Sequence, residues 1–100
     1  KAHPGGFRRE IKVFVAYVGE GTQTAAFRLT AALRERGVPA EMEYGGKSLK
    51  SQLKRADKSG AGFTFIIGED ELSRGKAKLR RMETSSEEEV DIEIAPTLSF

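Results

Sequence analysis

The chain has 100 residues, of which 38% are hydrophobic and 32% are charged, and its formal net charge is +2. This composition indicates a single globular domain with a modest core, and no apolar run reaches the roughly 18 residues of a membrane span. The lack of cysteine excludes disulfides and thiolate metal sites, and the one histidine, His3, leaves little for a histidine-based triad or a zinc site. We therefore expect a cytoplasmic protein.

The segment up to residue 44 predicts a β-α-β unit. Residues 11–18, IKVFVAYV, carry apolar side chains on both faces, which is typical of a central strand covered on both sides. After a glycine-containing turn, alanines and leucines recur at helical spacing. Thr22 or Thr24 is predicted to cap this helix, and Gly37 to end it. A short second strand is predicted over residues 38–44.

The second half of the chain predicts another helix followed by three strands. The helix covers residues 48–58 and ends at a Ser-Gly pair, and residues 62–68, GFTFIIG, form a strand that is apolar on both faces. Residues 76–84 alternate as a strand, and the sequence TSSEEE is predicted to be a turn leading to a last strand over residues 90–94. The ending, residues 95–100, is predicted to be a helical remnant or a tail.

Together these elements predict an α/β fold with three layers. The β-α-β-α-β core favours parallel strands joined by right-handed crossovers, and the short connections after it favour antiparallel strands. The result is a mixed sheet of about five strands flanked by helices. Residues 11–100 are expected to form the domain, after a tail or linker over residues 1–10.

Charges are segregated along the chain. Residues 47–58 carry five Lys or Arg against one acid, and residues 74–81, RGKAKLRR, carry five basic side chains and no acid. Residues 83–93 hold six acids and no base. Such segregation favours an anionic partner near the two basic segments, although solvated faces would give the same pattern.

Two nucleotide-binding motifs are incomplete. The sequence GGKS resembles the end of a phosphate-binding Walker A loop, but Glu41 stands where that motif needs its first glycine. The sequence GEGTQT half-matches the dinucleotide motif G-x-G-x-x-G, with Thr24 in place of the third glycine and Glu20 beside the expected pyrophosphate. Glu41 and Glu43 lie where a ribose-binding acid would be expected. The two glycines of GGKS still predict a helix N-terminus that offers N–H groups to one phosphate.

The two basic segments predict a surface for a larger polyanion. On the helix over residues 48–58 and just before it, four lysines fall within an arc of about 80° and span about 16 Å. In the strand over residues 76–84, Lys76, Lys78 and Arg80 share one face. Unpaired RNA bases expose edges that nearby polar side chains could bind. The residues predicted to contact RNA are Tyr44, Gly46, Lys47, Ser48, Lys50, Gln52, Lys54, Glu69, Glu71 and Arg80.

Catalysis and metal binding have little support in the sequence. No serine or threonine has a histidine outside the predicted tail to activate it. The acids Glu69, Asp70 and Glu71 could coordinate magnesium, but neighbouring acids in a turn more often face water. We expect no catalytic residue, metal or cofactor in this domain.

The segment YGGKSLKSQLKRADKSGAGFTFIIGEDELSRGKAKLRRMET closely resembles the C-terminal anticodon-binding domain of histidyl-tRNA synthetases of the bacterial type. That family shows a glycine-rich turn, then R/K-S-L-K-x-Q-x-K-x-A-D-K, a hydrophobic strand and G-E-x-E-L-x-x-G. Each part is present here, from Gly46 to Lys58 and then from Gly68 to Gly75. The resemblance covers residues 11–94, and the tail from Ala95 departs from the family's closing helix.

The resemblance implies a five-stranded mixed sheet that docks the anticodon stem-loop of histidine tRNA. It implies that the parent is a homodimeric histidine–tRNA ligase, in which a separate catalytic domain of the same chain uses ATP and magnesium for aminoacylation. By analogy with related synthetases, Gly46 to Lys54, Glu71 and Arg80 are expected to contact the anticodon. Two alternatives remain: a non-catalytic, synthetase-like module that binds RNA or pairs subunits, and a nucleotide-binding enzyme.

Overall fold

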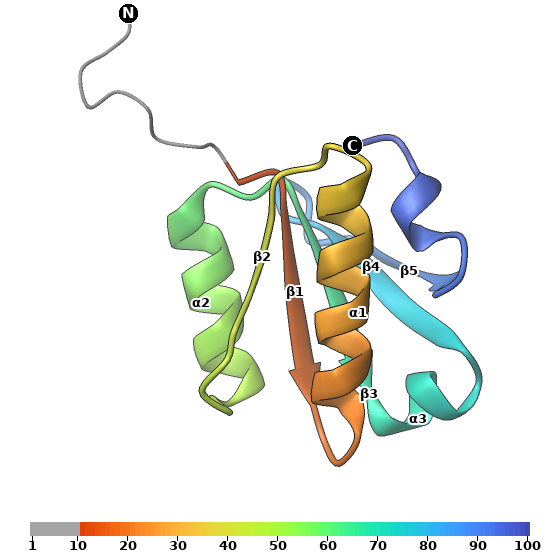
Figure 1. Ribbon diagram of the computed structural model, residues 1–100. Helices are drawn as coiled ribbons and strands as arrows, with labels where there is room; N and C mark the ends of the chain where they lie inside the picture. The colour runs from red at the N-terminus through yellow and green to blue at the C-terminus, as the bar shows by residue number, and fades with distance from the viewer. Residues whose placement is uncertain (1–10) are drawn as a thin grey trace, which may run out of the picture.

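The computed structural model describes residues 11–100, and the tail or linker predicted for residues 1–10 lies outside the described residues. The described chain forms one mixed sheet with helices on both of its faces (Figure 1). This arrangement confirms the predicted α/β fold with a five-stranded sheet.

The first part of the chain forms the predicted β-α-β-α-β core. Its elements are β1 (Val13–Val18), α1 (Thr22–Glu35), β2 (Ala40–Met42), α2 (Leu49–Ser59) and β3 (Phe63–Gly68). β1 pairs in parallel with both β2 and β3, so the carboxyl ends of these three strands lie at one edge of the sheet. The segments that lead into α1 and α2 begin at this edge.

The remaining chain extends the sheet with antiparallel strands. Its elements are α3 (Glu69–Ser73), β4 (Lys76–Arg81), β5 (Glu87–Asp91) and a 3₁₀ turn, η1 (Ala95–Thr97). β4 pairs with β3, and β5 with β4, which gives the strand order β2-β1-β3-β4-β5. The ending is therefore a helical remnant, and Phe100 returns to pack edge-on against Phe63 and Phe65.

Hydrophobic clusters on the two faces of the sheet fix the helices. On one face, Leu29 and Leu33 of α1 pack over Val15 and Phe65 of the central strands, and all four are buried. On the other face, Ala56 of α2 packs with Phe14 and Ile66. Figure 1 shows α1 and α2 on either side of β1. Successive side chains of β1 and β3 point to opposite faces of the sheet and so contribute to both clusters. This is what strands with apolar residues on both faces predict.

Several predicted boundaries were wrong. β4 ends at Arg81, whereas the prediction ran to residue 84. The residue that caps α1 is Gly21, in a left-handed conformation, and the Thr22 hydroxyl instead donates to the carbonyl of Gly19 at 2.6 Å. β2 is shorter than residues 38–44. β5 begins at Glu87, within the predicted turn, because the hairpin closes earlier: Arg81 and Ser86 pair through their backbones, and Ser85 adopts a positive φ of 63°.

Candidate nucleic-acid interface

The outer side of α2 and the turn before it present a row of exposed lysines. Lys47, Lys50, Lys54 and Lys58 are all exposed. Among residues 11–100, none of the four takes part in an ion pair. The opposite side of the helix carries the buried Ala56, so the amphipathic pattern directs these ammonium groups toward solvent. This row is the α2 basic face.

The turn before α2 has the geometry that its glycines and serine predict. Gly46 has a φ of +70°, in the left-handed region that residues other than glycine rarely adopt. Ser48 is the N-cap residue of α2, and its hydroxyl oxygen accepts a hydrogen bond from the N–H of Ser51 at 3.2 Å. Ser48 thus keeps its hydroxyl hydrogen available at the exposed start of the basic face.

Gln52 was predicted to contact RNA, and the structure places it in the interior instead. Its side chain is fully buried, and its Oε1 accepts the Tyr17 N–H at 3.0 Å. Its Nε2 donates to the carbonyls of Tyr17 at 2.7 Å and Lys47 at 2.8 Å. β2 ends at Met42, opposite Val15, so Gln52 takes the place of a strand beside Tyr17. Its role is to position the turn.

Sequence reasoning missed the ion pair that supports this turn. Glu43 is buried, its Oε2 accepts the Gly45 N–H at 2.7 Å, and its Oε1 contacts Arg55 Nη1 at 2.8 Å. The hydrogen bond from Gly45, with the nearby Arg55, lowers the pKa of the Glu43 carboxyl. The available signal was an acid two residues before a glycine pair, but its spacing after the GEGTQT turn suggested a ribose-binding acid instead.

The turn between β1 and α1 is occupied by a carboxylate of the protein. Glu69 Oε2 accepts the Glu20 N–H at 2.8 Å. Its side chain also crosses Gly19, where an added Cβ would clash with Glu69 Cγ. A pyrophosphate bound in the dinucleotide manner would need this position, and it would meet a negative charge there. Glu69 therefore closes the turn, and the geometry disfavours a dinucleotide site.

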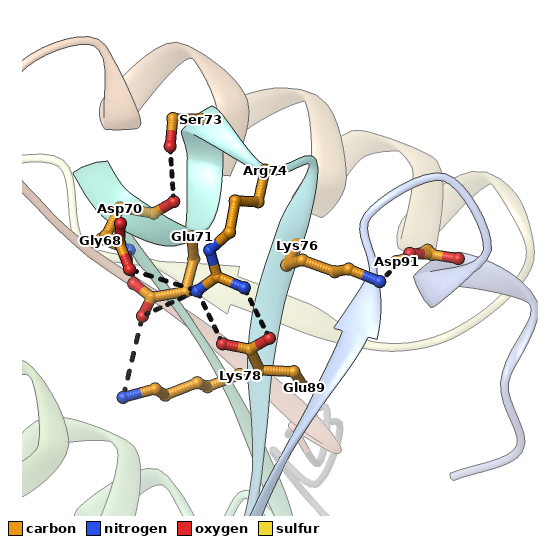
Figure 2. A network of polar contacts seen from close by, with 9 residues as sticks. All are labelled: Gly68, Asp70, Glu71, Ser73, Arg74, Lys76, Lys78, Glu89 and Asp91. Carbon is orange, nitrogen blue, oxygen red and sulfur yellow. Dashed lines mark hydrogen bonds and ion pairs between the residues drawn. The ribbon is translucent and has the colours of Figure 1, made fainter.

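Glu71 lies at the same edge of the sheet, where it holds α3. Its Oε1 accepts the Gly68 N–H at 3.1 Å, while its Oε2 lies 3.7 Å from Lys78 Nζ. Figure 2 shows this carboxylate between α3 and β4, next to the Arg74 guanidinium. With a side chain only 14% exposed, Glu71 has little surface left for a ligand.

The three acids of α3 diverge and form no metal site. Asp70 pairs with Arg74 at 3.2 Å, while Glu69 and Glu71 turn to the backbone amides already described. Within residues 11–100, no group of three or more His, Cys, Asp or Glu side chains could hold a metal ion. In the same part of the chain, no helix has the length and apolar character that crossing a membrane requires.

The basic segment of β4 is neutralised by the acidic segment of β5. The strand register places Lys76 opposite Asp91, Lys78 opposite Glu89 and Arg80 opposite Glu87. Lys76 Nζ lies 2.6 Å from Asp91, and Arg80 Nη1 lies 2.8 Å from Glu87. The charges that are segregated along the sequence therefore meet in the hairpin, and the predicted basic face of β4 is paired with acids of the protein.

The predicted contact residues divide into two groups. Tyr44, 52% exposed, lies with Gly46, Lys47, Ser48, Lys50 and Lys54 along the turn and the outer side of α2. Gln52, Glu69, Glu71 and Arg80 are engaged with the protein itself. The lysines of the first group form a run of positive charge, which suits a nucleic acid, while Tyr44 lies beside Phe27 and Ala31 of α1.

Comparison with known proteins identifies the family. Residues 12–98 match the model of a family described as anticodon binding domain. The chain belongs to the anticodon-binding domain family. The match includes both the α2 basic face and the β4–β5 hairpin of this anticodon-binding domain.

Individual relatives confirm the resemblance to histidyl-tRNA synthetases. The domain is 51% identical over 80 residues to the histidine–tRNA ligase of Geobacter sulfurreducens, covering 80% of this chain and 19% of that protein. It is 46% identical over 84 residues to that of Geobacter metallireducens, covering 84% and 20%. The crystal structure of apo S. aureus histidyl-tRNA synthetase superposes with a TM-score of 0.82 at 30% identity, covering 88% of this chain and 26% of that one. This anticodon-binding domain thus spans about a fifth of the length of its curated relatives.

Proposed function

We propose that this domain docks the anticodon stem-loop of histidine tRNA, as part of a histidine–tRNA ligase. In that enzyme a separate catalytic domain would attach histidine with ATP and magnesium, and no catalytic group is assigned to residues 11–100. The observation that carries the proposal is the α2 basic face, whose lysines have no acidic partner in this part of the chain. The family and its histidine–tRNA ligase members support the choice of RNA.

The basic face would bind phosphates while the turn contacts bases. Lys50, Lys54 and Lys58 span about 12 Å along α2, which covers more than one phosphate spacing, and each neutralised phosphate releases counterions. Tyr44 offers an exposed ring on which an unpaired base could stack, and Ser48 offers its hydroxyl. Gln52 and Glu43 act indirectly, because their buried hydrogen bonds hold the turn in place.

The test is a salt-dependent binding titration with two RNAs. The histidine tRNA anticodon stem-loop is compared with a stem-loop whose anticodon is scrambled. Tighter binding of the first, weakening steeply with salt, supports anticodon recognition by this domain. Equal binding of both would support the alternative of a general RNA-binding or subunit-interaction module. Tight mononucleotide binding with little salt dependence would instead indicate a nucleotide-binding enzyme.

Charge reversal on α2 tests the basic face directly. Lys47→Glu and Lys54→Glu are each expected to weaken binding of both RNAs and to reduce the salt slope by about one charge equivalent. Arg28→Glu is the control, because Arg28 is exposed on α1, on the opposite face of the sheet, and has no ion-pair partner among the described residues. Equal losses in all three variants would show that net charge, and not the α2 face, determines binding.

A further inference from the structure

Arg74, just before β4, and Lys76 and Arg80 within it form a second set of cations, each in contact with an acid of β5. Arg74 forms two hydrogen bonds of 2.8 Å to the two carboxylate oxygens of Glu89. Lys76 pairs with Asp91 at 2.6 Å and Arg80 with Glu87 at 2.8 Å. Figure 2 shows Arg74, Lys76 and their partners on β5 side by side. The contact with Arg74 also lowers the pKa of Glu89.

These pairs lie on the same face of the sheet as α2. Ala77 and Leu79 of β4 are buried in the cluster beneath α1, so the alternate residues of the strand point the other way. Lys78 stands opposite Ile66, which packs with Ala56 of α2. α2 itself packs against β1, which is two strands away from β4. An RNA lying along α2 would therefore have the β4–β5 pairs beside it on the same face.

We propose that Glu87, Glu89 and Asp91 are specificity-determining residues, which keep the cations of Arg74, Lys76 and Arg80 from binding RNA phosphates indiscriminately. This inference rests on the proposed function, since it concerns which part of the face the RNA uses. Each carboxylate occupies the position on its cation that a phosphate oxygen would take. Non-specific RNA is left with the α2 basic face, and a nucleotide reaches Arg80 only by replacing Glu87.

The physical basis is an exchange of one anion for another. A phosphate that approaches an unpaired lysine gains an ion pair and releases counterions. A phosphate that approaches Lys76 must first displace Asp91, which returns a carboxylate to solvent and cancels most of that gain. The exchange favours only a ligand that makes further hydrogen bonds to the guanidinium or to neighbouring bases, as a cognate anticodon would.

The test neutralises the three acids without changing their size. The variant Glu87→Gln, Glu89→Gln, Asp91→Asn is titrated with the scrambled stem-loop over a range of salt concentrations. We expect its affinity for this RNA to rise at least about tenfold at low salt, and its salt slope to steepen by about two, as three added phosphate contacts predict. Affinity for the cognate stem-loop should rise less, so that discrimination falls.

A matched variant separates this effect from net charge. Glu83→Gln, Glu88→Gln, Glu93→Gln removes the same charge from the same segment, but these acids are exposed and have no ion-pair partner among residues 11–100. Glu88 stands opposite Leu79 in the hairpin, on the other face of the sheet. A smaller gain in affinity for the scrambled stem-loop in this control supports the proposal, and an equal gain in affinity overturns it.

A third variant guards against misfolding of the hairpin. Adding Lys76→Gln to the neutralised variant removes one freed cation and should return part of the gain in affinity and slope. A gain that persists unchanged would show that unfolding or another surface is responsible, and would overturn the proposal. A domain that fails to distinguish anticodons would count against the proposed function, while the titrations with the scrambled RNA would still decide whether the three acids keep these cations from binding phosphates.

Discussion

Gln52 joins the end of a strand, the start of a helix and the turn between them through one buried amide. Replacing it by alanine leaves the N–H and C=O of Tyr17 and the C=O of Lys47 without their partner. We expect Gln52→Ala to lower the free energy of unfolding by about 3 kcal/mol, measured by urea denaturation, because buried polar groups without partners are costly.

An exposed glutamine provides the control for this substitution. Gln23 makes one hydrogen bond of 3.3 Å to the carbonyl of Tyr44, at the surface. Gln23→Ala should therefore change the free energy of unfolding by less than about 0.5 kcal/mol. Similar values for the two variants would mean that the Gln52 hydrogen bonds contribute little to the fold.

The lowered pKa of Glu43 predicts a specific loss of stability in acid. The fold binds the ionised carboxylate, so this stabilisation is fully present above the ordinary pKa of 4.5 and is lost as the pH falls through the lowered value. Glu43→Gln lacks the charge at every pH. We expect the wild type to be more stable than this variant at pH 7, and the difference to shrink toward pH 3. A difference that stays constant would assign the effect to hydrogen bonding alone.

At the scale of elements, the sequence was most informative where hydrophobic patterns are strong. β1, β3 and the two long helices were predicted because their apolar periods match their burial. β5 was misplaced because three consecutive glutamates have low strand propensity. Ion pairs of Glu87 with Arg80 and of Glu89 with Arg74 offset that low propensity, and such partners are known only once the hairpin register is known.

The turn before α2 depends on one backbone conformation. Gly46 has a φ of +70°, and no other atom stands within 4 Å of a Cβ added there, so substitution tests conformation without a steric clash. We expect Gly46→Ala to destabilise the fold by about 1 kcal/mol and to weaken RNA binding by displacing Lys47. Gly62→Ala is the matched control, because its surroundings are equally open and its φ is not in the left-handed region. Equal stability of the two variants would contradict the argument.

For the whole molecule, the net charge of +2 conceals two different surfaces. The exposed lysines of α2 could be predicted, because helical spacing alone places them on one side. The ion pairs of the second basic segment could not be predicted, because they depend on β5, which folds back along β4. Gln52 escaped prediction for a related reason: nothing local shows that β2 is too short to pair with Tyr17.

The sheet order also has a consequence for how the molecule meets other copies of itself. Its two edge strands, β2 and β5, are the places where unpaired backbone groups could recruit a strand from another chain. β2 spans only Ala40–Met42, and four of the five residues of β5 are acidic, so two identical β5 edges would repel one another. The acids that hold the cations of β4 thus also protect the outer edge of the sheet against aggregation.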